Sequence, residues 1–117
     1  MRHHEKLRAR ELGMALVEAV YRCTERFPAD ERFGLCNQLR RAAVSVPSNI
    51  AEGAARGSSA DYLRFSYMAR GSLSEVDTQL KIAHRLAYLS DLSSTDELLE
   101  QAFGQLGGLI KHMQTKV

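Results

Sequence analysis

The sequence predicts an all-α protein, an antiparallel up-down-up-down bundle of four helices. Two observations support this. Apolar residues recur at intervals of three and four along four separate stretches, which is the spacing of one face of an α-helix. The links between these stretches are short, so that consecutive helices are expected to pack side by side and antiparallel. At 117 residues the chain is expected to form a single domain over 1–117.

The first predicted helix covers about 6–26. Its apolar stripe consists of Leu12, Leu16, Ala19 with Val20, Cys23 and Phe27. Phe27 is followed by Pro28, and a residue that precedes proline avoids helical geometry. The pair is therefore expected to end the helix.

The second predicted helix covers about 30–55, with Asp30 as its N-cap and Gly57 as the glycine just beyond its end. Its stripe consists of Leu35, Leu39, Ala42, Val46 and Ile50. Pro47 falls inside this stripe, where it removes one backbone hydrogen bond and collides with the preceding turn. Because the stripe keeps its phase, the sequence favours one helix kinked at Pro47. Two helices broken near Val46 are the alternative.

The third and fourth predicted helices each begin with a serine followed three residues later by an acid, a capping-box pattern. These pairs are Ser58 with Asp61, and Ser94 with Glu97. The third stripe consists of Tyr62, Phe65, Ala69, Leu73, Val76, Leu80, Ala83 and Ala87. The fourth consists of Leu99, Ala102, Leu106, Leu109 and Met113.

The sequence offers no catalytic constellation, cofactor motif or metal site, so we expect a protein that is not an enzyme. The four histidines (His3, His4, His84 and His112) lack the paired spacing that zinc requires. Cys23 and Cys36 flank the first turn symmetrically and could lie near each other, although two small core residues are the favoured interpretation. No secretory signal or membrane-length apolar run is visible, which predicts a cytoplasmic protein without membrane contact.

Small and polar residues gather on the second and third predicted helices. The structural interpretation is a tight helix contact, in which Gly71 and Ser72 let the backbones approach. The polar members would then satisfy one another or the kink; they are Ser45, Asn49, Glu52, Ser72 and Glu75. A polar pocket or ligand surface is the functional alternative.

Arginine is the predominant base, accounting for 12 of the 16 basic residues. The segment from 40 to 70 contains five arginines and only two acids, although the net charge of the whole chain is only +2. A guanidinium fork suits phosphate groups, and the candidate phosphate contacts are Arg40, Arg41, Arg56 and Arg64. A solvated face with ion pairs, such as Glu18 with Arg22, explains arginines equally well.

The run Gln-Leu-Arg-Arg-Ala-Ala-Val-Ser-Val-Pro-Ser-Asn-Ile-Ala-Glu-Gly at 38–53, with 56–65 and 69–75, resembles the four-helix bundle proteins encoded in intervening sequences of bacterial 23S ribosomal RNA genes. Related bundles include the accessory protein of diversity-generating retroelements. The resemblance implies a homopentamer that binds RNA or DNA, and a reverse transcriptase as a possible partner.

Two functions follow as expectations. The first is a non-enzymatic homo-oligomer that binds structured nucleic acid through Arg-rich faces. The alternative is a protein-interaction scaffold for a reverse transcriptase or another nucleic-acid enzyme. Several apolar residues off the stripes would be exposed in a monomer and could form subunit contacts. They are Leu7, Met14, Phe33, Tyr67 and Met68.

Overall fold

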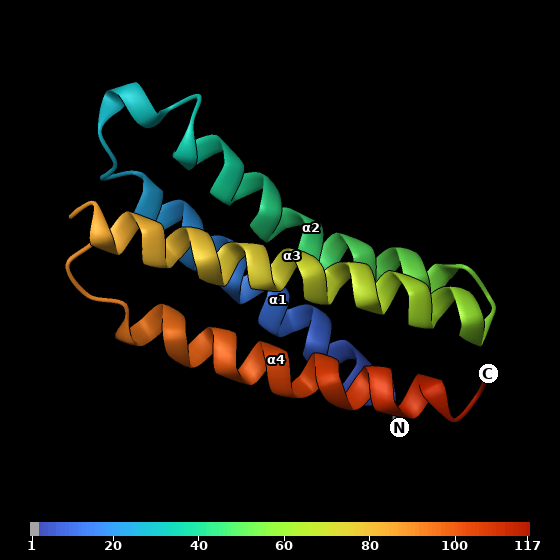
Figure 1. The fold of residues 1–117 in the computed structure, drawn as a ribbon. Helices are drawn as coiled ribbons and strands as arrows, with labels where there is room; N and C mark the ends of the chain where they lie inside the picture. Colours follow the sequence, from blue (N-terminus) through green and yellow to red (C-terminus); the bar gives the residue numbers. More distant parts are fainter. Residues whose placement is uncertain (1–2) are drawn as a thin grey trace.

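Four α-helices make up the computed structural model, which describes residues 3–117, with side chains from Leu7 onward. The helices are α1 (His3–Thr24), α2 (Leu35–Ala55), α3 (Ser59–Arg85) and α4 (Ser93–Gln114), and a short 3₁₀ helix, η1 (Ala29–Glu31), precedes α2. Each helix runs back along its predecessor, and α4 also packs against α1, which closes the ring (Figure 1). The predicted four-helix bundle is confirmed.

The four apolar stripes supply the core. Its fully buried large side chains are Leu16, Val20, Leu39, Val46, Leu73, Val76, Leu80, Leu106 and Leu109. Ala87 is the exception among the predicted stripe residues, because α3 ends at Arg85 and Ala87 lies exposed in the following turn at φ 65°. The third stripe therefore ends at Ala83. Cys36 is buried, Cys23 is half-buried, and both are free thiols.

Of the three predicted N-terminal helix caps, one is right and two are wrong. The Ser58 hydroxyl accepts a hydrogen bond from the Asp61 N–H at 3.1 Å, as the capping pattern predicts. Asp30 does not cap α2, because it lies in η1 and α2 begins only at Leu35. The Glu31 carboxylate accepts from the Leu35 N–H instead, at 3.1 Å.

At α4 the predicted start is also wrong, since the helix begins at Ser93 rather than after Ser94. The side chain that supports this start is Asp91, whose two carboxylate oxygens accept from the Ser93 N–H at 2.9 Å and the Ser93 hydroxyl at 3.0 Å. An aspartate two residues upstream thus satisfies the N–H of the first helical residue, as in an Asx turn. Gly57, by contrast, has the positive φ of 81° expected beyond the end of α2.

Helix α2 continues through Pro47 from Leu35 to Ala55, which excludes two separate helices, while the kink itself remains a prediction. Two polar side chains bond to carbonyls in the turns around the proline. The Ser45 hydroxyl donates to the Ala42 carbonyl at 2.8 Å, and the Asn49 amide donates to the Ser45 carbonyl at 2.7 Å. Both side chains therefore serve the local backbone of α2.

Of the two glycines, Gly53 and not Gly71 lies in a close contact between α2 and α3. A Cβ atom on Gly53 would lie 2.8 Å from Phe65 Cβ and 3.2 Å from Tyr62 Cδ1, whereas one on Gly71 would meet nothing within 4 Å. The predicted packing role of Gly71 is therefore wrong, because Gly71 faces solvent and Gly53 faces α3. None of the described helices combines the length and hydropathy that a membrane span requires.

Candidate functional site

Arg40 is committed to contacts inside the bundle. Its Nε donates to the Thr24 hydroxyl at 2.8 Å, and its guanidinium carbon lies 4.4 Å from the centre of the Tyr21 ring. Thr24 is itself buried, and its hydroxyl donates to the Val20 carbonyl. Arg40 therefore ties α2 to the end of α1, through its bond to Thr24 and a long 3.5 Å bond to the Tyr21 carbonyl.

Arg56 and Arg64 flank one aromatic ring where α2 turns into α3. Their guanidinium carbons lie 4.9 Å and 4.5 Å from the centre of the Phe65 ring. Each also pairs with an acid on its own helix segment, Arg56 with Glu52 at 2.9 Å and Arg64 with Asp61 at 3.3 Å. Exposed pairs of this kind contribute about 0–1 kcal/mol to stability. Their main effect is to hold both guanidinium groups in place.

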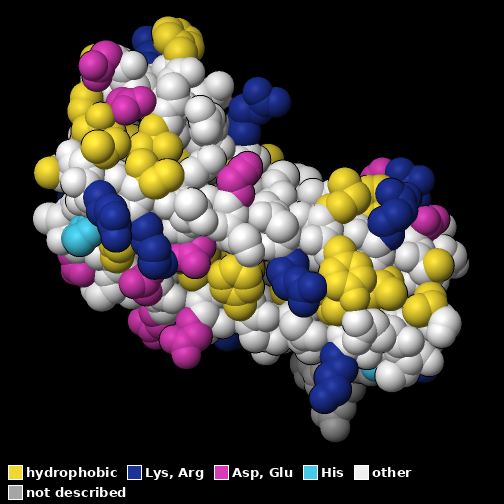
Figure 2. Space-filling view, viewed as in Figure 1, with side chains coloured by type: hydrophobic (Ala, Val, Ile, Leu, Met, Phe, Trp, Pro, Cys, Tyr) yellow, Lys and Arg dark blue, Asp and Glu magenta, His cyan; other side chains and the backbone are white. Residues whose placement is uncertain are grey.

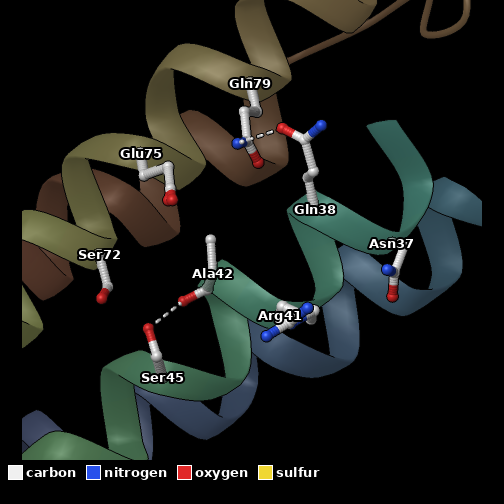
Figure 3. Close-up of a pocket in the computed structure, with 8 residues that line it drawn as sticks. All are labelled: Asn37, Gln38, Arg41, Ala42, Ser45, Ser72, Glu75 and Gln79. Atoms are coloured by element: carbon white, nitrogen blue, oxygen red, sulfur yellow. Dashed lines mark hydrogen bonds between the residues drawn. The ribbon is translucent and has the colours of Figure 1, made fainter. Parts of the chain in front are cut away.

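Arg41 lies on the wall of a groove of about 370 Å³ between α2 and α3 (Figure 3). The groove is lined by Asn37, Gln38, Arg41, Ala42, Ser45, Ser72, Glu75 and Gln79. Of the predicted polar cluster, Ser45, Ser72 and Glu75 meet here. Asn49 and Glu52 do not line the groove: Asn49 bonds to its own helix and Glu52 pairs with Arg56.

Gln79 is a buried amide at the inner end of this groove. It is 8% exposed, and its Nε2 donates to Gln38 Oε1 over a long 3.5 Å. Its own Oε1 is buried and has no hydrogen-bond partner among the described residues. A buried acceptor left unpaired costs about 1–3 kcal/mol. Sequence reasoning missed Gln79, although a lone amide between the stripe residues Val76 and Leu80 was the available signal.

The charged groups of the groove are also unpaired. Within the part of the chain that the structure describes, neither Arg41 nor Glu75 makes an ion pair or a side-chain hydrogen bond. Both are exposed, one on each wall. Around the groove, the surface carries basic side chains interspersed with acidic and apolar ones, so that this face has no continuous basic stripe (Figure 2).

Outside the groove, the histidines, cysteines and acids were the other candidates for a metal site or a nucleophile. Among residues with described side chains, no three His, Cys, Asp or Glu side chains gather where they could hold a metal ion. Cys23 lines a second pocket, of about 560 Å³, near the α3–α4 turn. Burial raises the pKa of its thiol, and this effect outweighs the opposing influence of Arg26 and Arg22. Cys23 is therefore no activated nucleophile.

The fold and the groove define a small helical bundle that carries surface arginines and one polar groove between its second and third helices. The chain belongs to the family described as 23S rRNA-intervening sequence protein, whose family model matches residues 5–110. This match covers all the arginines and groove residues discussed above, and it confirms the family predicted from 38–75. A comparison with curated proteins found no match.

Proposed function

We propose that this protein is a non-enzymatic, homo-oligomeric helical bundle that binds structured RNA or DNA weakly through its arginines. The observation that carries the proposal is the exposure of three guanidinium groups on the α2–α3 side. Arg41 has no ion pair among the described residues, and Arg56 and Arg64 are held against Phe65. A guanidinium stacked on a ring keeps N–H groups free for phosphate oxygens.

The charges of these groups set the expected strength of binding. Glu52 and Asp61 partly neutralise Arg56 and Arg64, and the whole chain carries only +2. Three phosphate contacts per chain would give a logarithmic salt slope of about −2 to −3. Arg40 is left out of the proposed contact set because its Nε already bonds to Thr24.

The test is a filter-binding titration of an RNA hairpin and a DNA hairpin at low and at physiological salt. We expect retention at low salt, and a loss of retention in the R41A/R56A/R64A variant. Arg22→Ala is the matched control, because Arg22 is an exposed, ion-paired arginine on α1. Absence of retention for both nucleic acids at low salt would reject the proposal.

Self-association is supported by exposed apolar side chains. All five residues predicted to be exposed are so, with exposed fractions from 37% to 85%: Leu7, Met14, Phe33, Tyr67 and Met68. Apolar residues of this kind mark a protein contact where they form one continuous patch. Light scattering should give a multiple of 13.1 kDa, five-fold if the pentamer implied by the family resemblance is right. A monomeric mass would reject self-association.

A scaffold for a protein partner is the second candidate, and Phe33 favours it. This ring is 85% exposed between η1 and α2, and Arg32 lies over it at 5.5 Å. Aromatic and arginine side chains dominate the binding energy of protein interfaces. If the partner is a reverse transcriptase or another cytoplasmic nucleic-acid enzyme, a pull-down with that enzyme should succeed with the native chain and fail with Phe33→Ala.

A further inference from the structure

We propose that Arg70 is a further phosphate contact of this protein, held in position by Tyr67 and Gln114 where α3 meets the last turn of α4. The ligand is a phosphate group of an RNA or DNA backbone. The inference therefore rests on the proposed nucleic-acid binding, and it adds one contact that the sequence did not single out.

Three side chains in series join the end of α4 to α3. Gln114, the last residue of α4, donates from its Nε2 to the Tyr67 hydroxyl at 2.7 Å. Arg70 lies one turn after Tyr67 on α3, and its guanidinium carbon lies 5.0 Å from the centre of the Tyr67 ring. A cation at this distance is attracted by the face of an aromatic ring. Arg70 is therefore held in place, although it is an exposed residue.

Arginines that lie over aromatic rings are frequent in this chain. Among the described residues, five guanidinium carbons lie within 5.5 Å of a ring centre, where a chain of this length would have about one or two such pairs. Arg40, Arg56 and Arg64 belong to this group and also have a hydroxyl or an acid as partner. Arg70 has neither among the described residues, so its charge is not neutralised by a neighbouring acid.

The sequence around Arg70 explains why it has no acidic partner. On a helix, an arginine pairs with an acid three or four residues away, as Arg56 does with Glu52 and Arg64 with Asp61. The positions three and four residues from Arg70 carry Ser66, Tyr67, Leu73 and Ser74. A phosphate that approaches Arg70 therefore competes with no carboxylate of the same helix face.

The adjacent part of α4 leaves room for a phosphate backbone. Gly107 lies two turns before Gln114 and hence on the same side of α4. Because α4 runs back along α3 and Gln114 contacts Tyr67, Gly107 lies beside the part of α3 that follows Arg70 (Figure 1). A Cβ atom on Gly107 would meet nothing within 4 Å. A nucleic-acid strand can therefore approach closely here without displacing a side chain.

Arg70 and Arg64 are far enough apart to contact different phosphates of one nucleic acid. They are separated by six residues of α3, which is about 9 Å along the helix axis. A duplex carries one phosphate per strand for about every 3.4 Å of its axis. Figure 2 shows basic side chains spaced over the face on which α3 lies, with other side chains between them. Separate arginines, rather than a basic stripe, are the expected contacts.

The test extends the filter-binding titration to single variants of α3. Arg70→Ala removes one charged contact, so binding at low salt should weaken at least about twofold. The logarithmic salt slope should become shallower by about 0.7–0.9. Arg85→Ala is the matched control, because Arg85 is an exposed arginine of α3 that lies over no ring among the described residues. Its loss should leave the slope unchanged.

Two results of this titration would overturn the inference and leave the proposed nucleic-acid binding intact. One is an equal loss of binding in Arg70→Ala and Arg85→Ala, which would mean that only net charge matters. The other is native binding by Arg70→Ala. If the native chain retained neither RNA nor DNA, both the proposed function and this inference would fail.

Variants of Tyr67 test whether the ring positions Arg70. Tyr67→Ala leaves the charge of Arg70 in place but removes the ring beneath it, so the arginine must be immobilised when it binds. Affinity should then fall about two- to tenfold, with little change in the salt slope. Tyr67→Phe keeps the ring and should bind like the native chain. Native affinity in Tyr67→Ala would overturn the positioning by Tyr67 that the proposal requires.

A contact between copies of the chain is the competing role for this pair, because Tyr67 is itself 38% exposed. Light scattering of Arg70→Ala distinguishes the two roles. A phosphate contact leaves the mass of the variant equal to that of the native chain, while its binding to RNA and DNA weakens. A lower mass in Arg70→Ala would assign the pair to the contact between copies and overturn the inference.

Discussion

Gly53 lies in α2 and Gly71 lies in α3. Replacing each glycine with alanine changes helix propensity at both positions but fills a close contact only at Gly53, so the two variants separate these two effects on stability. Gly53 is buried, and its new Cβ would lie 2.8 Å from Phe65 Cβ and 3.3 Å from Tyr62 Cα. Neither neighbour is the tip of a flexible side chain, so the helices must shift apart. Gly71 is exposed on α3 and would gain a methyl group in open space.

The two effects have known sizes. Alanine is favoured over glycine inside a helix by about 1 kcal/mol, and this gain is common to both variants. Overpacking in a filled contact costs about 1–3 kcal/mol, and only Gly53→Ala incurs it. We therefore expect Gly71→Ala to raise the free energy of unfolding by about 1 kcal/mol. The free energy of unfolding of Gly53→Ala should lie about 1–3 kcal/mol below that of Gly71→Ala.

The assay is denaturant unfolding followed by far-ultraviolet circular dichroism, with all variants at one protein concentration because self-association would add to the apparent stability. A Gly53→Ala variant as stable as Gly71→Ala would refute the inference that Gly53 lies in a filled contact with α3. Gly53→Ser, with a larger side chain, should be less stable again.

Three further predictions concern single contacts. Arg40→Ala should lower the free energy of unfolding by about 1–2 kcal/mol, because it removes the bond to Thr24 and the contact with the Tyr21 ring. Arg41→Ala should stay within about 0.5 kcal/mol of the native chain. Equal losses in the two variants would contradict the assignment of Arg40 to contacts with α1. Ser58→Ala should cost about 1 kcal/mol through the lost cap of α3, measured by thermal unfolding against the exposed Ser74→Ala. The hydrogen bond from the Leu35 N–H, and next the one from the Tyr88 hydroxyl, lower the pKa of Glu31. The ionised Glu31 carboxylate therefore stabilises the fold at pH values above its unfolded pKa, and this stabilisation is lost as the pH falls through its folded pKa. Stability should therefore fall less between pH 7 and pH 3 in Glu31→Gln than in the native chain, and parallel pH curves would contradict this prediction.

The sequence by itself determined the four helices and most of the core. Helical periodicity is a local property, and each stripe had to face inward because its apolar side chains leave water together. Ser58 and Gly57 were predictable for the same reason, since the cap and the left-handed turn involve neighbouring residues. The runs at 38–53, 56–65 and 69–75 likewise predicted the family.

Contacts between helices were decided only by the tertiary structure. Periodicity predicts which side of a helix a residue lies on but not which atoms it contacts. Gly71 was therefore predicted to lie in the close contact between α2 and α3, where the structure has Gly53. Arg40 and Arg41 are adjacent in sequence, yet one bonds to α1 and the other borders the groove. Glu31 replaced Asp30 at the start of α2 because a 3₁₀ turn intervenes and because Tyr88, 57 residues away, holds the Glu31 carboxylate at 2.8 Å.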